Sequence, residues 1–262
     1  MIEYTKETLT KALLNISNMG WIENRRSGND GGVGNTLEDL LGITENNLPL
    51  PNAAEWELKT HRKGSSSLLT LFHVEPSPRA MKIVPNLLLP KYGWKHKDAG
   101  GRYPEGEKSF RQTINSGGTG RGFKVKADYI NRRVVISFDS ASVDDEFADW
   151  LENLRQTIGL DELNPVPYWG FDDLAGKIRT KLLNCFYVKA SVKTENNKKF
   201  WHYNEIYRCS NFSFDKFLEQ LEMGNVFVDF DARTGHNHGT KFRYAECVHG
   251  IEALYDNVIK IL

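Results

Sequence analysis

Two charged residues, Glu57 and Lys59, are separated by one residue in the segment AEWELKT (54–60). On an extended strand they project from the same face, because side chains alternate between faces. A carboxylate beside a lysine suits metal-dependent phosphodiester hydrolysis, since the carboxylate can hold Mg²⁺ and the lysine can orient the attacking water. The main-chain carbonyl of Leu58 can add a metal ligand. The competing interpretation is a solvated strand face, because charged side chains are mostly exposed.

Two other acidic residues lie close enough in the sequence to join such a site. Glu55 precedes Glu57 by two positions, so a strand spanning both would place their carboxylates on one face. Glu38, next to Asp39, lies upstream in a short segment with helical periodicity that follows a Gly-rich stretch. An acid in the first turn of a helix also simply favours the helix dipole, so both interpretations of Glu38 stay open.

A second cluster of polar residues lies late in the chain, in DFDARTGHNHGTKFRY (229–244). Its basic and imidazole side chains are Arg233, His236, His238, Lys241 and Arg243. The His-x-His pair can belong to a zinc site, but Asp229 and Asp231 are candidates only by proximity, and no further ligand has a customary spacing. The other interpretation is DNA contact, because arginine suits guanine edges and histidine can donate to bases. His73, at the end of LLTLFH, is either a further reader or a structural histidine.

Other basic segments are Arg25–Arg26, Arg62–Lys63 and the Gly-, Lys- and Arg-rich segment 93–122. The last is expected to form a long surface loop, and loops of this length are usually functional or disordered. Basic pairs are usually solvated, but together these segments can line a groove for a phosphate backbone.

The periodicity of apolar residues predicts the elements that position these side chains. Helices are expected at 5–18, 36–42, 142–156, 172–183 and 212–224, with Thr5 and Thr36 as caps and with Gly42 and Gly224 at two of the ends. Hairpins are expected between 54–60 and 67–74, within 123–139 and within 184–207, followed by strands at 226–233 and 239–246. This mixture predicts one α/β or α+β domain around a central mixed sheet.

The composition is that of a folded protein, since 40% of the 262 residues are hydrophobic and 26% are charged. The formal net charge is zero, so no global charge indicates nucleic acid or membrane, although a basic groove balanced by acidic faces is compatible with it. The three cysteines have neither a metal-type spacing nor a disulfide pattern. The N-terminus lacks signal-peptide features, and no apolar run reaches membrane-spanning length. A soluble cytoplasmic protein is expected.

Five sequence blocks occur in an order that resembles the MvaI/BcnI family of type II restriction endonucleases. They are GGVGNTLEDLLGI, PNAAEWELKTHRK, SLLTLFHVEP, YWGFDDL and DARTGHNHGTKFR. The first block is also similar to the mismatch-repair nicking endonuclease MutH and its Sau3AI-like relatives. The matched blocks run from about residue 20 to residue 245, so the resemblance covers nearly the whole chain.

The resemblance implies a PD-(D/E)xK nuclease fold, in which helices flank a central mixed β-sheet and DNA lies in a cleft. It implies one restriction-endonuclease-like unit over 1–262, with a catalytic part at about 20–140 and a DNA-recognition part at about 165–262. The implied activity is Mg²⁺-dependent cleavage of double-stranded DNA by a monomer, which nicks the two strands in turn at a short, G·C-rich, nearly palindromic site. A cognate DNA methyltransferase is the expected genetic companion.

The resemblance also implies roles for residues of this chain. Glu57 is expected to be a metal ligand, Lys59 the catalytic lysine and Glu38 a supporting acid. The recognition elements are His73 and the segment HNHGTKFR, in which His238 and Arg243 are expected to read bases, with Arg233 as a further reader.

One position departs from the family pattern: Asn52 stands where the motif has its first aspartate, five residues before Glu57. Asparagine keeps the shape and one carbonyl oxygen but lacks the charge, which should weaken Mg²⁺ binding. The chain is then an inactivated Asp→Asn variant, a nuclease in which Glu55 supplies the missing charge, or a protein that binds its site without cutting. A MutH-like nicking endonuclease that acts with repair partners is a further alternative.

Overall fold

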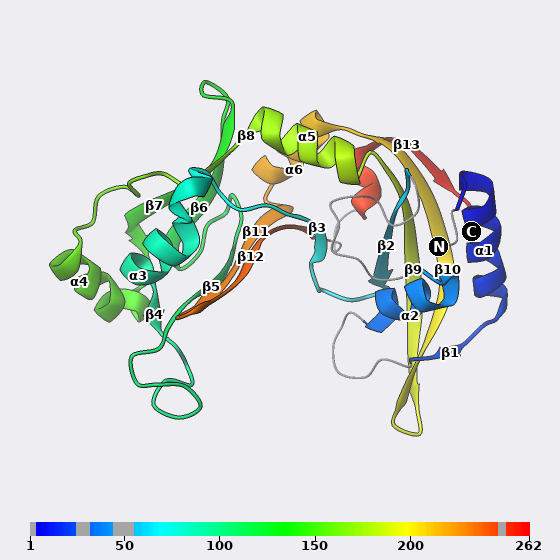
Figure 1. Cartoon of the computed structure of the whole chain (residues 1–262), viewed down its shortest axis with the longest axis horizontal. Helices are drawn as coiled ribbons and strands as arrows, with labels where there is room; N and C mark the ends of the chain where they lie inside the picture. The colour runs from blue at the N-terminus through cyan, green and yellow to red at the C-terminus, as the bar shows by residue number, and fades with distance from the viewer. Residues whose placement is uncertain (1–3, 25–31, 44–54, 246–249) are drawn as a thin grey trace. The chain divides into compact units, whose positions relative to one another are not determined.

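The computed structural model describes residues 4–24, 32–43, 55–245 and 250–262. The chain forms two compact units, each assembled from separated segments (Figure 1). The first unit takes Met1–Leu69, Ala175–Lys216 and Ala245–Leu262, and the second takes Thr70–Leu174 and Phe217–Tyr244. Each unit thus contains residues from both of the ranges that were expected to form separate parts, 20–140 and 165–262. The assignment of catalysis and recognition to those two ranges stays a prediction.

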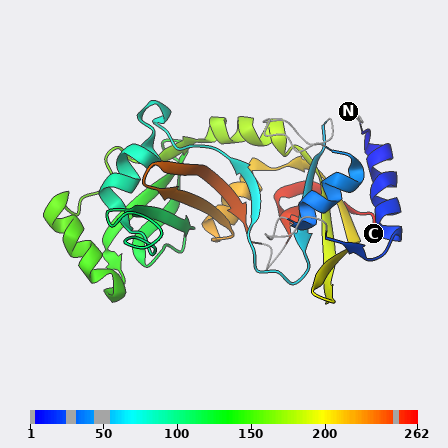
Figure 2. The same ribbon diagram turned by 60° about the horizontal axis from the view of Figure 1, so that its bottom comes forward.

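The first unit is built on a mixed five-stranded sheet with the order β1-β10-β9-β2, in which β13 also pairs with β10. Its strands are β1 (Ile22–Glu23), β2 (Glu57–Arg62), β9 (Asn184–Glu195), β10 (Lys198–Phe212) and β13 (Tyr255–Lys260). The β2 strand runs parallel to β9, with Glu57 opposite Cys185. Figure 2 shows the β9–β10 ribbon of this unit from a second direction.

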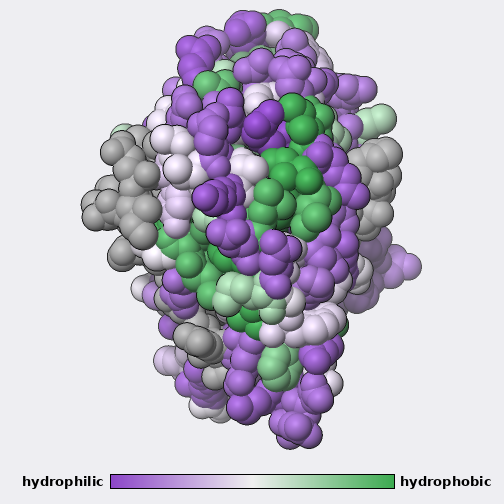
Figure 3. Space-filling view, turned by 90° about the vertical axis from the view of Figure 1, so that its right-hand side faces the viewer, coloured by the Kyte–Doolittle hydropathy of each residue, from purple (hydrophilic) through white to green (hydrophobic). Residues whose placement is uncertain are grey.

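Helices α1 (Lys6–Asn18) and α2 (Gly32–Leu41) cover one face of this sheet. Their buried side chains share a core with those of the strands, and this core includes Leu9, Leu13, Leu37, Leu58, Phe186 and Val188. Glu57 and Lys59 alternate with Leu58 along β2, so they occupy the opposite face. Figure 3 shows the side of the protein at the right of Figure 1, where apolar side chains gather among hydrophilic ones.

Thr5 caps α1, as predicted. The Thr5 hydroxyl accepts a hydrogen bond from the Thr8 amide at 3.2 Å, and the Thr8 hydroxyl accepts one from the Thr5 amide at 2.8 Å. This reciprocal arrangement is a capping box, which satisfies amides that the first turn leaves without partners.

The predictions for the two ends of α2 have different outcomes. Gly42 has a φ of 65°, which suits the residue that ends a helix, as predicted. The prediction of Thr36 as the cap is wrong, because the chain is already helical at Gly32. Thr36 is buried inside the helix, and its hydroxyl donates to Asn24 at 3.3 Å.

The second unit contains two sheets, ordered β3-β12-β11-β5-β4 and β6-β7-β8. Their strands are β3 (Leu69–His73), β4 (Trp94–Lys95), β5 (Lys108–Ile114), β6 (Arg121–Asp128), β7 (Arg133–Val143), β8 (Tyr168–Gly170), β11 (Val226–Arg233) and β12 (His236–Tyr244). An aromatic core joins the sheets: the Phe110 ring centroid lies 5.4 Å from Phe123 and 5.5 Å from Phe230, in edge-on contacts.

The other helical segments connect these strands. They are η1 (Arg79–Met81), η2 (Val84–Leu88), α3 (Leu89–Tyr92), η3 (Asp145–Phe147), α4 (Ala148–Thr157), α5 (Phe171–Lys181), α6 (Phe214–Glu222) and η4 (Ile251–Leu254). The helices predicted at 142–156, 172–183 and 212–224 are confirmed with shifted ends.

The predicted hairpins β6–β7 and β9–β10 are confirmed, and the two late strands form a third hairpin, β11–β12. The hairpin predicted between 54–60 and 67–74 is wrong, because β2 pairs with β9 whereas β3 pairs with β12 in another sheet. The prediction of one long loop at 93–122 is also wrong, since β4, β5 and the start of β6 lie within it. The mixed α/β class is confirmed, with several sheets in place of one central sheet.

Candidate active site

Strand β2 places Glu57 and Lys59 side by side, as their spacing predicts. Lys59 Nζ lies 2.9 Å from Glu57 Oε1, and the lysine and glutamate side chains are 14% and 3% exposed. Little water screens an ion pair this buried, so each charge strongly influences the other. The side chain of Leu58 packs into the hydrophobic core, which leaves its main-chain carbonyl as the candidate ligand.

Glu57 has a second oxygen that the described groups leave unsatisfied. Its Oε2 is buried and has no hydrogen-bond partner among the residues that the structure describes. A buried polar atom without a partner is unfavourable by about 1–3 kcal/mol, and more when it is charged. A hard cation such as Mg²⁺, which prefers carboxylate oxygens, fits this atom.

The described residues supply only part of a metal site. Within 4–24, 32–43, 55–245 and 250–262, no group of three or more His, Cys, Asp or Glu side chains is placed to hold a metal ion. Asn52 lies outside these ranges, so its position relative to Glu57 stays a prediction.

Lys181 also contacts this site, although no sequence pattern had indicated it. It is the last residue of α5, and its Nζ lies 3.9 Å from Glu57 Oε1. Burial lowers the pKa of Lys181; the Glu57 carboxylate opposes this, and the Lys59 ammonium adds to it. Two lysines therefore share one buried carboxylate. The signal that could have found Lys181 is the basic last turn of α5, which leads into β9, the neighbour of β2.

The two further acids predicted near the site are placed differently from each other. Glu38, on α2, is half-buried and interacts electrostatically with Lys181, whose pKa it raises. Glu55 is exposed in a turn, because β2 begins only at Glu57. The expectation that one strand carries both Glu55 and Glu57 is therefore wrong.

The predicted recognition histidines lie in the second unit, on the β11–β12 hairpin and its neighbour β3. His236 and His238 are exposed, and their ring centroids are 4.2 Å apart in an edge-on arrangement. His73 is exposed at the end of β3, where the Val74 amide donates to the Thr240 carbonyl at 3.0 Å. One sheet therefore carries all three histidines.

The predicted arginines of this sheet are held by carboxylates. Arg233 Nη1 lies 3.1 Å from Glu107 Oε1. Arg243 Nη1 lies 3.3 Å from Asp229 Oδ2, and the half-buried Lys241 lies on the same strand. These ion pairs orient both guanidinium groups.

The described residues give no support to the zinc interpretation. Asp229 is engaged by Arg243 and accepts a hydrogen bond from the Thr113 hydroxyl at 3.0 Å. Asp231 lies 3.4 Å from Arg111. In the described part of the chain, neither acid joins the histidines in a group that could hold a metal.

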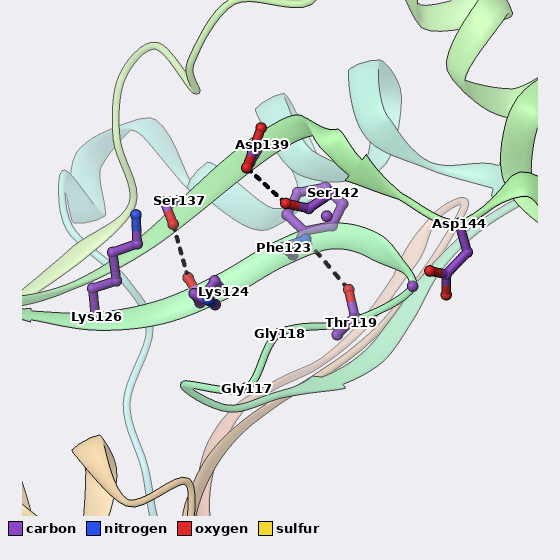
Figure 4. Close-up of a pocket in the computed structure, with 12 residues that line it drawn as sticks. Gly117, Gly118, Thr119, Phe123, Lys124, Lys126, Ser137, Asp139, Ser142 and Asp144 are labelled. Carbon is purple, nitrogen blue, oxygen red and sulfur yellow. Dashed lines mark hydrogen bonds between the residues drawn. The ribbon is translucent and has the colours of Figure 1, made fainter.

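The Gly-rich segment that was predicted to join a basic groove lines a pocket of about 310 Å³ in the second unit (Figure 4). Lys124 and Lys126 line this pocket together with Asp139 and Asp144, so its charges balance. The Ser142 hydroxyl donates to Asp139 at 2.7 Å, as Figure 4 shows. The pocket is polar, but it is not basic.

A buried Glu-x-Lys pair lies on the mixed sheet of the first unit, and exposed histidines lie on a sheet of the second unit. The sequence profile of the MvaI/BcnI restriction endonuclease family matches residues 10–255. The chain belongs to this family.

Two solved structures are similar to the whole chain. One is described as "Restriction endonuclease MvaI-cognate DNA substrate complex"; it is 27% identical, with a TM-score of 0.75 over 99% of this chain and 100% of that one. The other, "Restriction endonuclease MvaI in the absence of DNA", is 28% identical, with a TM-score of 0.52 over 100% of both chains. No curated protein matches the chain. Among the described residues, no helix is long and apolar enough to cross a membrane.

Proposed function

We propose that this chain is a type II restriction endonuclease that hydrolyses phosphodiester bonds of double-stranded DNA at a specific site, with Mg²⁺ as its cofactor. The observation that carries the proposal is the buried Glu57, whose Oε2 lacks a described partner while Lys59 and Lys181 flank Oε1. Similarity to a restriction endonuclease solved with its cognate DNA substrate supports it.

The proposed metal ligands centre on Glu57 Oε2. The further candidates are the main-chain carbonyl of Leu58, the side-chain oxygen of Asn52 and the carboxylate of Glu38. Bound Mg²⁺ supplies a more acidic water and stabilises negative charge on the phosphate.

The two lysines have separate proposed roles. Lys59, on the same strand as Glu57, orients the attacking water. Lys181, at the end of α5, neutralises negative charge on the scissile phosphate. Both groups are preorganised by the same carboxylate, so little rearrangement is needed when the substrate binds.

Sequence recognition is assigned to the second unit. Three exposed histidines, His73, His236 and His238, are proposed to contact the DNA. Lys241 is proposed to contact phosphates, and Arg233 and Arg243 are proposed to contact bases. Arginine pairs with guanine O6 and N7, which fits a short G·C-rich, nearly palindromic site. A monomer would nick the two strands in turn. It would act in the cytoplasm, and a cognate DNA methyltransferase would be its genetic companion.

The second candidate is a family member that binds its site without cutting, which Asn52 in place of an aspartate favours. Compensation by Glu55 is the alternative that a Glu55→Gln variant tests, with Glu55 in a turn before β2 and not on the strand. A third candidate is a nicking endonuclease whose final product is a single-strand break.

One digest separates these candidates. Supercoiled plasmid is incubated with the chain, its Asn52→Asp variant or its Glu57→Gln variant, in Mg²⁺ or in EDTA. We expect transient nicked circles and then discrete linear fragments, both dependent on Mg²⁺ and Glu57. Permanent nicks indicate the nicking enzyme, and cutting by Asn52→Asp alone indicates the inactivated form. Random degradation contradicts site-specific cleavage, and no cutting by either the chain or Asn52→Asp contradicts endonuclease function.

A further inference from the structure

A second pocket lies at the end of β2 in the first unit, with a volume of about 470 Å³. It is lined by residues 61–66, which are the end of β2 and the turn after it, and by Lys189 and Glu205. The candidate active site uses none of these residues. We call this cavity the β2-end pocket.

The β2-end pocket lies on the same sheet face as the candidate active site. Glu57, Lys59 and His61 alternate along β2 onto one face, and Lys189 is opposite His61 in the parallel register. His61 follows Glu57 by four positions, which corresponds to roughly 13 Å along the strand. A DNA strand with its scissile phosphate at Glu57 would reach the pocket within a few nucleotides, since phosphates recur about every 3.4 Å along the helix axis.

The charge of the β2-end pocket favours an anion. Three cations, Arg62, Lys63 and Lys189, line the pocket, against Glu205 in the lining and Glu252 beside Lys189, so cations exceed acids by three to two. The Gly-rich pocket of the second unit, by contrast, has two lysines against two aspartates. An excess of positive charge in a concave site raises the local concentration of anionic ligands.

Glu205 is the acid of the pocket, and it pairs with one of the lysines. Lys63 Nζ lies 2.7 Å from Glu205 Oε2. Burial raises the pKa of Glu205, but hydrogen bonds from Lys63 and Tyr207 outweigh this and hold the pKa below its ordinary value. Glu205 is therefore an anion that competes with any anionic ligand for Lys63.

Lys189 is positioned by aromatic rings. Its ammonium lies 5.1 Å and 5.4 Å from the ring centroids of Tyr187 and Tyr207, which stack at 6.2 Å with an interplanar angle of 26°. Its Nζ also lies 3.4 Å from Glu252 Oε1. Cation–π contact and this ion pair fix the ammonium at the pocket.

The turn after β2 lines one side of the pocket, and it is polar and sterically accessible. Ser65 Oγ lies 3.3 Å from Arg62 Nη2 and 2.8 Å from Ser67 Oγ. Gly64 has a φ of 70°, and a Cβ added there would meet nothing within 4 Å. A ligand can therefore approach the main chain of this turn closely.

We propose that the β2-end pocket binds a backbone phosphate of the DNA, a few nucleotides from the scissile bond. The inference rests on the proposed function and extends it to a defined contact. Such a contact carries no sequence information, but it fixes the register of the strand relative to Glu57.

The first test is the salt dependence of binding to a short random-sequence duplex in the absence of divalent metal ions. Each neutralised phosphate contributes about 0.9 to the slope of log K against log salt. We expect Lys189→Met to lower the slope by about one, Lys189→Arg to keep it, and Glu205→Gln to tighten binding because a competing anion is lost. Thermal melting confirms that each variant is folded.

A matched control lies on the other side of the same sheet. Lys11 is exposed on α1, the helix that covers the opposite face. Lys11→Met should leave the slope unchanged. The proposal is overturned if folded Lys189→Met and Lys63→Met both keep the slope of the unmodified chain, or if Lys11→Met lowers it equally.

The second test locates the phosphate. Duplexes carrying the cut site mapped by the plasmid digest are made with one neutral methylphosphonate at each position in turn. At one flanking position, the methylphosphonate should weaken DNA binding by the unmodified chain but should not weaken DNA binding by Lys189→Met. If DNA is bound and no position distinguishes the two proteins, the pocket assignment fails while the proposed function stands. If neither the chain nor Asn52→Asp cuts DNA, the proposed function fails, and the salt dependence alone decides the pocket.

Discussion

The ammonium of Lys181 lies 3.9 Å from the same Glu57 oxygen that Lys59 contacts at 2.9 Å. One carboxylate oxygen thus holds two lysines from separate elements, and the other oxygen is left for a ligand. Removing Lys181 should therefore weaken catalysis without removing the metal ligand. We predict that Lys181→Met lowers the single-turnover cleavage rate by roughly 10²-fold, as loss of one preorganised donor does elsewhere, while DNA affinity changes little.

The control for this variant lies on the same helix. Arg179 is exposed on α5, so Arg179→Met alters the charge of the helix but not the Glu57 contacts. It should cut at nearly the unmodified rate. Equal losses in both variants would show that Lys181 acts only through the general charge of α5.

Glu57→Gln should remove the stabilisation that Mg²⁺ gives to the folded chain. A ligand at about 100 times its dissociation constant stabilises a protein by about 2.7 kcal/mol, so Mg²⁺ should raise the melting temperature of the unmodified chain. The glutamine variant keeps the shape but not the charge of the ligand. A Mg²⁺-dependent shift that persists in Glu57→Gln, measured by thermal melting, would place the metal elsewhere.

Asn52→Asp should lower the Mg²⁺ concentration that gives half-maximal cleavage by roughly tenfold or more, because affinity for such ions rises with the charge of the ligand set. Glu55→Gln is the companion variant. Since Glu55 is exposed in a turn outside β2, its loss should have little effect. Abolished cleavage in Glu55→Gln would instead establish compensation by Glu55.

His61 predicts a pH dependence of stability in the first unit. Burial lowers its pKa from 6.5, and the nearby charges of Lys189 and Arg62 add to this, whereas its hydrogen bond to Ser67 opposes it. The unfolded chain therefore binds the proton more readily, so the stabilising effect of neutral His61 is present above pH 6.5 and is lost as the pH falls through the folded-state value. Urea unfolding of the chain and of His61→Gln between neutral and mildly acidic pH measures this difference. If the free energy of unfolding depends on pH identically in the unmodified chain and in His61→Gln, this prediction is refuted.

Arg121 should contribute to the stability of the second unit. Its guanidinium lies 4.0 Å from the centroid of Trp94 and 3.8 Å from that of Phe147. Desolvated cation–π contacts are worth about 2 kcal/mol, so Arg121→Ala should lower the free energy of unfolding by about that amount. The exposed Arg155, on α4, is the control, and Arg155→Ala should change it by less than about 0.5 kcal/mol.

Local pattern was enough to predict some of these features. Residues two apart on a strand share a face in any sheet, so the Glu57–Lys59 contact followed from spacing alone. The hairpin β9–β10 was also predictable, because its strands are joined by a short turn. Helix capping by Thr5 followed from a similarly local signal.

Features that depend on distant segments were not predictable in this way. The alternation in 54–60 identifies a strand but not its partner, so parallel pairing with β9 was missed. Lys181 reaches Glu57 only because α5 leads into that same strand. Likewise, the Gly-rich composition of 93–122 concealed β5, whose Phe110 and Ile114 are fully buried.

The parallel pairing of β2 with β9 also determines when the candidate site can form during synthesis of the chain. Among the described strands, β9 is the only sheet neighbour of β2, and β9 begins at Asn184. A nascent chain that has emerged only as far as β8 has Glu57 and Lys59 but lacks both Lys181 and the strand that supports them. The candidate site is thus assembled only after β9 has been synthesised, and under the proposed function an incomplete chain would lack cleavage activity.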